Sequence, residues 1–147
     1  MDFRLTPQQE LFKRTVREFA EKNIAPRSRE IDQKAQGIPE EIIQGMTDLG
    51  LFGVTIPEEY GGTANPGEEL VYAMIAVHEV ARAELSMSLP VYYLLNLGWS
   101  YLLAKYGNEE TKRLVLPHVA KGEWFIGICT TEPSGGFQCS LDGGAFA

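Results

Sequence analysis

Apolar residues recur at helical spacing, between capping signals, over most of this 147-residue chain, and this pattern constrains its fold more than any other feature. The segment Thr6-Pro7-Gln8-Gln9 has a hydroxyl at the N-cap, proline at the first helical position and glutamine at N3, the arrangement of a capping box. An apolar stripe then follows at helical spacing: Leu11, Phe12, Val16, Phe19, Ala20 and Ile24. Pro26 is expected to interrupt this first helix.

The same reasoning predicts five more helices. They are expected over residues 27–34, 39–49, 65–82, 88–106 and 108–121, with glycines marking most of their ends. Asn65-Pro66-Gly67-Glu68 is expected to cap and begin the helix over 65–82, which is apolar almost all round and should lie at the centre of a bundle. Residues 51–57 are expected to be extended.

Only one segment predicts a β-strand. Residues 124–130 are aromatic and β-branched, as strands are. A lone strand leaves its backbone groups unpaired, so we expect either a continuation of the chain or a partner strand from another chain. The predicted fold is all-α: a six-helix bundle over residues 1–122, followed by one terminal strand within residues 123–147.

Composition excludes several function classes. The net charge of −7 and the pI of about 4.9 argue against a nucleic-acid partner and against a polybasic membrane contact. Residues 85–104 carry no charge, but their serines, proline and asparagine indicate a buried helix rather than a membrane span. Cys129 and Cys139 lie far from both histidines, so no zinc site is expected, and two reduced thiols suit an intracellular protein.

The residues alone indicate no catalytic constellation. The acidic pairs Glu40-Glu41, Glu58-Glu59 and Glu109-Glu110 lie at expected helix starts or in a loop, where they favour the positive end of a helix dipole. His78 is expected to be a structural histidine rather than a general base. The one informative segment is 130–136, where a strand ending in hydroxyls turns through proline and glycine and offers donors for a cofactor edge or a phosphate. The residues by themselves favour an ordinary exit from a strand into a turn over a cofactor site.

Four segments resemble the acyl-CoA dehydrogenase family. They are Leu5-Thr6-Pro7-Gln8-Gln9 with Ile24-Ala25-Pro26; residues 49–62, LGLFGVTIPEEYGG; residues 106–112, YGNEETK, with Leu116-Pro117; and Thr131-Glu132-Pro133 with Gly136. The resemblance implies an amino-terminal helical domain followed by the start of a middle β domain. It also implies a flavoprotein that uses FAD to oxidise an acyl-CoA to its α,β-enoyl form, with hydride passing to the flavin.

The resemblance carries specific residues with it. The flavin contacts are expected at Ile128, Thr130, Thr131, Ser134, Gly135 and Gly136. Leu94, Leu95 and Gly98 are expected to line one wall of the acyl pocket. The family's catalytic glutamate belongs to a carboxy-terminal domain, so none is assigned here. The implied partners are an acyl-CoA substrate, an electron-transfer flavoprotein and further copies or missing domains. The implied location is cytoplasmic, or the mitochondrial matrix in a eukaryote.

The chain departs from the family after Gly136. Phe137 stands where the family has the serine of a Gly-Ser-Asp sequence, and residues 137–147 resemble nothing in the family. We therefore expect an incomplete enzyme, with a frameshift or premature stop as one origin of the tail. Two alternatives stay open: a non-catalytic helical subunit that completes a flavoprotein in trans, and an enzyme of the same fold that acts on a nitroalkane or an aromatic thioester.

Overall fold

A computed structural model describes residues 4–34, 37–127, 131–132 and 135–136 of the protein. Helix α1 (Pro7–Phe19) starts at the predicted cap, because the Thr6 hydroxyl accepts from the Gln9 backbone N–H and the Gln9 side chain accepts from the Thr6 N–H. The chain continues through a π-helical turn (Ala20–Ile24) and a 3₁₀ turn (Ala25–Arg27) into α2 (Ser28–Lys34). The helical segment therefore continues past Pro26, where it changes from π-helical to 3₁₀ geometry, and is not ended by it.

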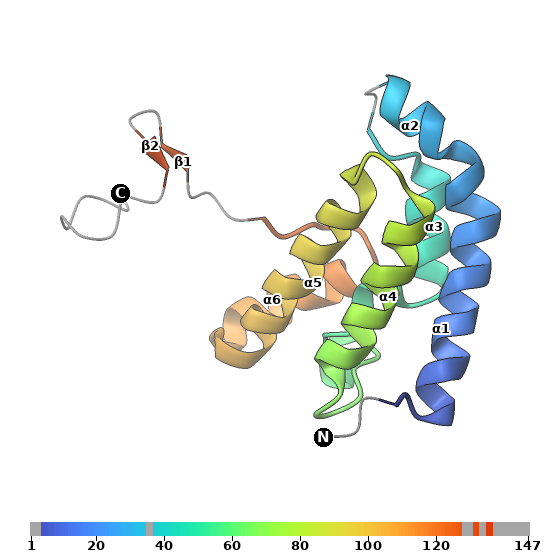
Figure 1. The fold of residues 1–147 in the computed structure, drawn as a ribbon. Helices are drawn as coiled ribbons and strands as arrows, with labels where there is room; N and C mark the ends of the chain where they lie inside the picture. Colours follow the sequence, from blue (N-terminus) through green and yellow to red (C-terminus); the bar gives the residue numbers. More distant parts are fainter. Residues whose placement is uncertain (1–3, 35–36, 128–130, 133–134, 137–147) are drawn as a thin grey trace.

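The remaining elements follow in chain order. They are α3 (Glu40–Asp48), two 3₁₀ turns (Leu51–Gly53 and Glu58–Tyr60), α4 (Glu69–Ala83), α5 (Ser88–Tyr106), α6 (Glu109–Ala120) and the strands β1 (Thr131–Glu132) and β2 (Gly135–Gly136). Figure 1 shows α4 between α1 and α5, with α6 beyond α5. The structure is therefore helical, as the apolar pattern predicts.

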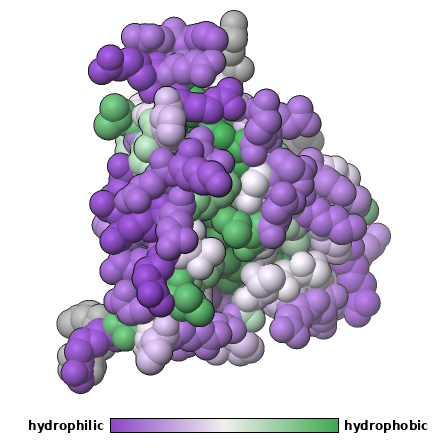
Figure 2. All heavy atoms as spheres, turned by 90° about the vertical axis from the view of Figure 1, so that its right-hand side faces the viewer, coloured by the Kyte–Doolittle hydropathy of each residue, from purple (hydrophilic) through white to green (hydrophobic). Residues whose placement is uncertain are grey.

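The main core lies among α1, α3, α4 and α5. Its fully buried members include Val16, Met46, Phe52, Val80 and Leu97. A second, smaller cluster lies between α6 and the 3₁₀ turn at Glu58–Tyr60, around Ile56, Leu116 and Val119. Seen from the α1 side, hydrophilic side chains surround a hollow in which apolar side chains gather (Figure 2).

Three local predictions are wrong. Residues 51–57 form a 3₁₀ turn and bends, not an extended segment, because Leu51, Phe52 and Ile56 are all buried and the backbone closes on itself around Gly53. Asn65 does not cap α4, since Gly67 has a φ of 83°, which no right-handed helix accommodates, and α4 begins only at Glu69. Residues 124–127 are not a strand; residues 128–130, the rest of that prediction, lie outside the described residues.

Helix α4 is central but not buried all round. Its buried side chains are Tyr72, Ala73, Ala76, Glu79, Val80 and Ala83, whereas Leu70, Val71 and Met74 are exposed. Small residues on the buried face let α1 and α5 approach closely. The larger apolar side chains are left on the surface.

Candidate functional site

The exposed face of α5 carries the residues predicted to line an acyl pocket. The leucines Leu94 and Leu95 are 45% and 44% exposed, and a Cβ at Gly98 would meet nothing within 4 Å. Their buried neighbours on the opposite face are Tyr93, Leu97 and Ser100. The structure thus brings Leu94, Leu95 and Gly98 onto one open, apolar helix face that has space in front of it.

The buried face of α5 holds an amide that contacts the chain beyond α6. Asn96 is 1% exposed, and its Oδ1 accepts a hydrogen bond of 3.0 Å from the backbone N–H of Ile126. The Phe125 ring packs against Tyr92 of α5 at 4.5 Å and against Phe52 at 5.6 Å between ring centroids. Figure 1 shows this segment crossing the helices before it leaves them.

His118, near the end of α6, also contacts the segment that follows α6. His118 Nδ1 lies 2.6 Å from a Glu123 carboxylate oxygen, and the His118 ring stacks on Trp124 at 4.3 Å. The His118 carbonyl accepts from the backbone N–H of Glu123. The His118 hydrogen bond lowers the pKa of Glu123 below its usual value.

Of the six residues predicted to contact a flavin, Thr131, Gly135 and Gly136 are described. Thr131 pairs with Gly136, and Glu132 with Gly135, in an antiparallel β1–β2 hairpin. Because β2 consists of two glycines, no Cβ stands between its backbone and an approaching planar ring, which suits a flavin edge. Ile128, Thr130 and Ser134 lie outside the described residues.

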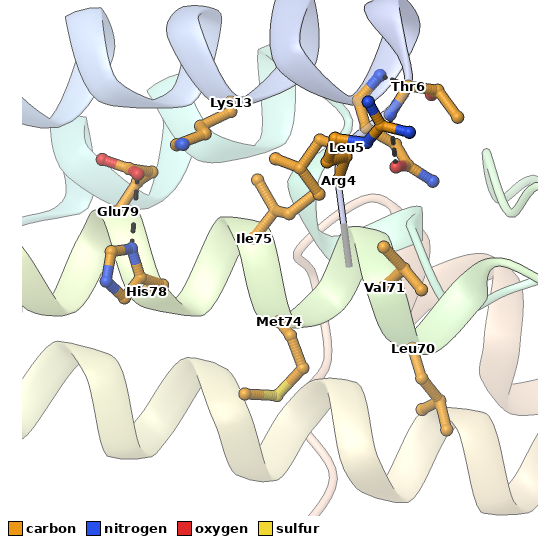
Figure 3. Close-up of a pocket in the computed structure, with 11 residues that line it drawn as sticks. Arg4, Leu5, Thr6, Lys13, Leu70, Val71, Met74, Ile75, His78 and Glu79 are labelled. Atoms are coloured by element: carbon orange, nitrogen blue, oxygen red, sulfur yellow. Dashed lines mark hydrogen bonds and ion pairs between the residues drawn. The ribbon is translucent and has the colours of Figure 1, made fainter. Parts of the chain in front are cut away.

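A groove of about 800 Å³ lies elsewhere, between the start of α1 and α4. Figure 3 shows Val71 and Ile75 inside it, with Lys13 and His78 at one end. In the same view Leu70 and Met74 point from α4 toward α5. Of the predicted flavin and acyl-pocket residues that the structure describes, none lines this groove.

Beside the groove, Glu79 is buried and its charge is neutralised by two arginines. The Arg17 guanidinium donates from Nε at 2.9 Å and from Nη2 at 3.0 Å, and Arg82 Nη1 donates at 2.9 Å. These hydrogen bonds, Arg17 first, outweigh burial and lower the pKa of Glu79 to about 2. His78 is 64% exposed at its side chain and lies 3.3 Å from Glu79, so this cluster joins α1 to α4 as an ion-pair network.

The acidic pairs at 40–41 and 109–110 lie in the first turns of α3 and α6, as predicted, and the pair at 58–59 lies in the 3₁₀ turn Glu58–Tyr60. Within the part of the chain that the structure describes, no helix combines the length and apolar character needed to cross a bilayer. No set of three or more His, Cys, Asp or Glu side chains among those residues is grouped to hold a metal ion.

Sequence reasoning missed Asn96 and Glu79. Each is a polar side chain within an apolar helix, and that position was the available signal, because a buried polar group almost always has a partner. Their partners lie 30 and 62 residues away in the sequence, so the pattern could not name them. The hairpin lies apart from α5 in Figure 1, and the structure does not bring the two predicted sites together.

Comparison with known proteins gives a consistent result. Residues 6–123 match the family described as "Acyl-CoA dehydrogenase, N-terminal domain". The chain is 33% identical, over 132 residues, to an acyl-CoA dehydrogenase of Bacillus subtilis (strain 168), an alignment that covers 90% of this chain and 34% of that protein.

Two solved structures are also similar. A glutaryl-coenzyme A dehydrogenase in complex with glutaryl-CoA has a TM-score of 0.82 at 35% identity, covering 92% of this chain and 34% of that one. Butyryl-CoA dehydrogenase from Megasphaera elsdenii has a TM-score of 0.78 at 28% identity, covering 90% and 34%. The chain therefore spans about a third of the length of the relatives that it matches.

Proposed function

This chain belongs to the acyl-CoA dehydrogenase family, and we propose that it serves as the helical part of an FAD-dependent enzyme that desaturates an acyl-CoA thioester. In that reaction a base removes the α proton of the substrate, and the β hydrogen leaves as hydride to the flavin. FAD would supply the electron acceptor. The residues of this chain would bind and shield rather than react.

The observation that supports this proposal is the open apolar face of α5. Leu94 and Leu95 are half-exposed on the one helix whose surface carries no charge before Lys105. An acyl chain is an apolar ligand, and a wall of leucines beside a glycine gives it contact and room. We propose that Leu94, Leu95 and Gly98 line this wall and measure the length of the acyl chain.

The flavin is proposed to bind at the hairpin. Thr131, Gly135 and Gly136 would present backbone groups to the ring, and Ile128, Thr130 and Ser134 would extend the same contact. The implied partners are the acyl-CoA substrate, an electron-transfer flavoprotein that reoxidises the cofactor, and further copies of the subunit. We propose a cytoplasmic location, or the mitochondrial matrix in a eukaryote.

A complementation assay tests this function. The chain is mixed with a polypeptide comprising the part of the Bacillus subtilis relative that follows the aligned 132 residues. The control mixture contains the relative's own aligned segment in place of this chain. We expect FAD retention, seen as flavin absorbance, and acyl-CoA-dependent reduction of that flavin. A colourless, inactive mixture, while the control mixture is yellow and active, would contradict the proposal.

A second candidate is a non-catalytic helical subunit that completes a flavoprotein in trans. The exposed apolar side chains of α4 and α5 favour it, because such surfaces mark protein contacts. The same mixture distinguishes the two candidates. FAD retention without flavin reduction by any acyl-CoA would support the binding subunit over the enzyme.

A further inference from the structure

We infer that Asn96 is a positioning residue, which fixes the chain at Ile126 against α5 and thereby limits where the flavin-side hairpin can lie. The inference builds on the proposed function, since it concerns the link between the acyl wall on α5 and the paired strands β1 and β2. Asn96 belongs to the same helix as Leu94, Leu95 and Gly98 but faces the opposite way, into the protein.

The contact needs a side-chain carbonyl oxygen at this position. The Asn96 Oδ1 accepts from the Ile126 N–H at 3.0 Å across 30 residues of sequence, and the side chain is 1% exposed. Its buried Nδ2 has no acceptor among the described residues. An amide with an unused donor is a costly way to fill space between apolar residues, where leucine would suffice. The observed geometry favours a role for the side chain beyond packing.

Residues 124–127 also make apolar contacts, but these do not fix the position of the chain along its own direction. Phe125 packs its ring on Tyr92 and Phe52, and Ile126 packs into the cluster around Leu116. Such apolar contacts are non-directional and tolerate sliding of the chain. A hydrogen bond fails when its donor moves by an ångström or so. The backbone N–H groups of Glu123 and Trp124 also donate to the His118 carbonyl, so beyond Trp124 the directional bond that sets the register of the described segment is the one at Ile126.

Fixing Ile126 constrains the hairpin. Thr131 is five residues further on, and an extended chain of that length spans roughly 18 Å at most. Thr131 must therefore lie within that radius of the point where Asn96 holds the backbone. Without the Asn96–Ile126 hydrogen bond, residues 124–127 could slide against α5. The region that Thr131 can occupy would then be larger.

Amide hydrogen exchange on the intact chain tests the tether. In Asn96→Leu we expect the protection of the Ile126 amide to fall about tenfold, because a net hydrogen bond is lost while the volume is kept. Asn96→Asp should keep most of this protection, because a buried carboxyl group stays protonated and its carbonyl oxygen still accepts. Retained protection in Asn96→Leu would overturn the inference.

Ser100→Ala is the matched control. Ser100 is equally buried one turn along α5 and bonds to the Asn96 and Leu97 carbonyls and to Thr55, but it does not contact Ile126. It should lower global stability without selective loss of protection at Ile126. If both variants lose protection equally at Ile126 and throughout the helices, Asn96 acts only through overall stability and the inference fails.

A titration with FAD tests whether Asn96 affects flavin binding. It uses the mixture of this chain with the remaining part of the Bacillus subtilis relative. Asn96→Leu should weaken FAD binding about tenfold relative to Ser100→Ala, and Asn96→Asp should restore it, in line with the value of one hydrogen bond. Lost protection at Ile126 with unchanged FAD affinity would overturn the positioning role. If the unsubstituted chain binds no FAD in any mixture, the proposed function fails, while exchange at Ile126 still decides whether Asn96 forms the tether.

Discussion

Glu79 shows how a single buried charge is held between two helices. It is fully buried, yet three hydrogen bonds from Arg17 and Arg82 keep it ionised and lower its pKa from 4.5 to about 2. A group whose pKa is lower in the folded state stabilises the fold above its unfolded pKa. That stabilisation is complete above about pH 4.5 and is lost as the pH falls toward 2. It amounts to no more than about 3 kcal/mol.

Replacing Glu79 should therefore change both stability and its acid dependence. In Glu79→Gln the two arginines lose their carboxylate in a buried site, and we expect the free energy of unfolding at pH 7 to fall by about 2–4 kcal/mol. The stability curves of Glu79→Gln and the unsubstituted protein should converge near pH 2, where Glu79 is protonating. Urea unfolding measured across pH 2–7 checks this.

Glu30→Gln is the control for that experiment. Glu30 pairs with Lys34 and Arg27 on an exposed surface, and its pKa is lowered mainly by Lys34. Exposed ion pairs contribute little to stability, so its unfolding curve should follow that of the unsubstituted protein. Parallel curves for Glu79→Gln from pH 7 to 2 would show that the carboxylate charge is not what stabilises the α1–α4 contact.

Two glycines should respond in opposite directions to alanine. A Cβ at Gly62 would overlap the backbone of Ile56, whereas a Cβ at Gly98 meets nothing within 4 Å on a helical backbone. Gly62→Ala should destabilise by more than about 2 kcal/mol through overpacking, and Gly98→Ala should stabilise by up to about 1 kcal/mol through helix propensity. Denaturant midpoints measure both. A neutral Gly62→Ala would contradict the close approach of this loop to Ile56.

At the scale of elements, helix starts were predictable where the capping chemistry was complete. Thr6 and Asn108 cap α1 and α6 with their side chains, as predicted, and Gly50 takes the left-handed conformation after α3 with a φ of 68°. The equivalent prediction at Asn65 was wrong. The signal there included Gly67, whose positive φ defines a turn, and residue type alone does not reveal which conformation a glycine adopts.

The Thr6 cap should have a measurable effect on α1. Thr6→Ala removes the oxygen that accepts from Gln9, and we expect a loss of about 1 kcal/mol in the free energy of unfolding. Thr15→Ala in the same helix is the control, because the Thr15 hydroxyl only bonds back to the Leu11 carbonyl and is exposed. It should be neutral or slightly stabilising. Thermal unfolding compares them, and equal losses would assign the effect to threonine removal in general.

The sequence pattern alone could not predict which face of α4 is buried or the conformation of the segment after α6. Because α4 is apolar almost all round, it has no single stripe to indicate which side faces inward, and packing selected Ala73, Ala76 and Val80 over Leu70 and Met74. Residues 124–127 have the composition of a strand but pair with no strand in the part of the chain that the structure describes. Their aromatic side chains instead pack on α5 and α6, and tertiary contact overrides β-propensity.

The candidate site was predictable only in its local parts. Thr131, Gly135 and Gly136 do form a tight hairpin, and Leu94, Leu95 and Gly98 do share one open face of α5. These two regions do not meet in the structure, and the link toward the hairpin is the hydrogen bond between Asn96 and Ile126, which are distant in sequence and carry no motif. Two residues 30 positions apart are brought into contact only by the packing of the helices, so the sequence pattern could not predict this hydrogen bond.

At the scale of the whole molecule, two neighbouring helices leave large apolar side chains in solvent. Leu70 and Met74 of α4 are 52% and 60% exposed, and Val91, Leu94, Leu95 and Leu102 of α5 are 40–45% exposed. Monomeric soluble proteins rarely expose large apolar patches. These six side chains are consistent with a chain that spans a third of its relatives' length and has surfaces suited to further contacts.

The purified chain should therefore self-associate through α4 and α5. Sedimentation velocity over a range of concentrations should show a concentration-dependent shift to larger species, and the double variant Met74→Glu with Leu94→Glu should remain monomeric because each charge opposes burial of the face. Leu114→Glu is the control, since Leu114 is 59% exposed on α6 and outside this set. Leu114→Glu should associate as the unsubstituted chain does. If all three proteins stay monomeric at high concentration, or if Leu114→Glu alone prevents association, then α4 and α5 do not form the contact surface.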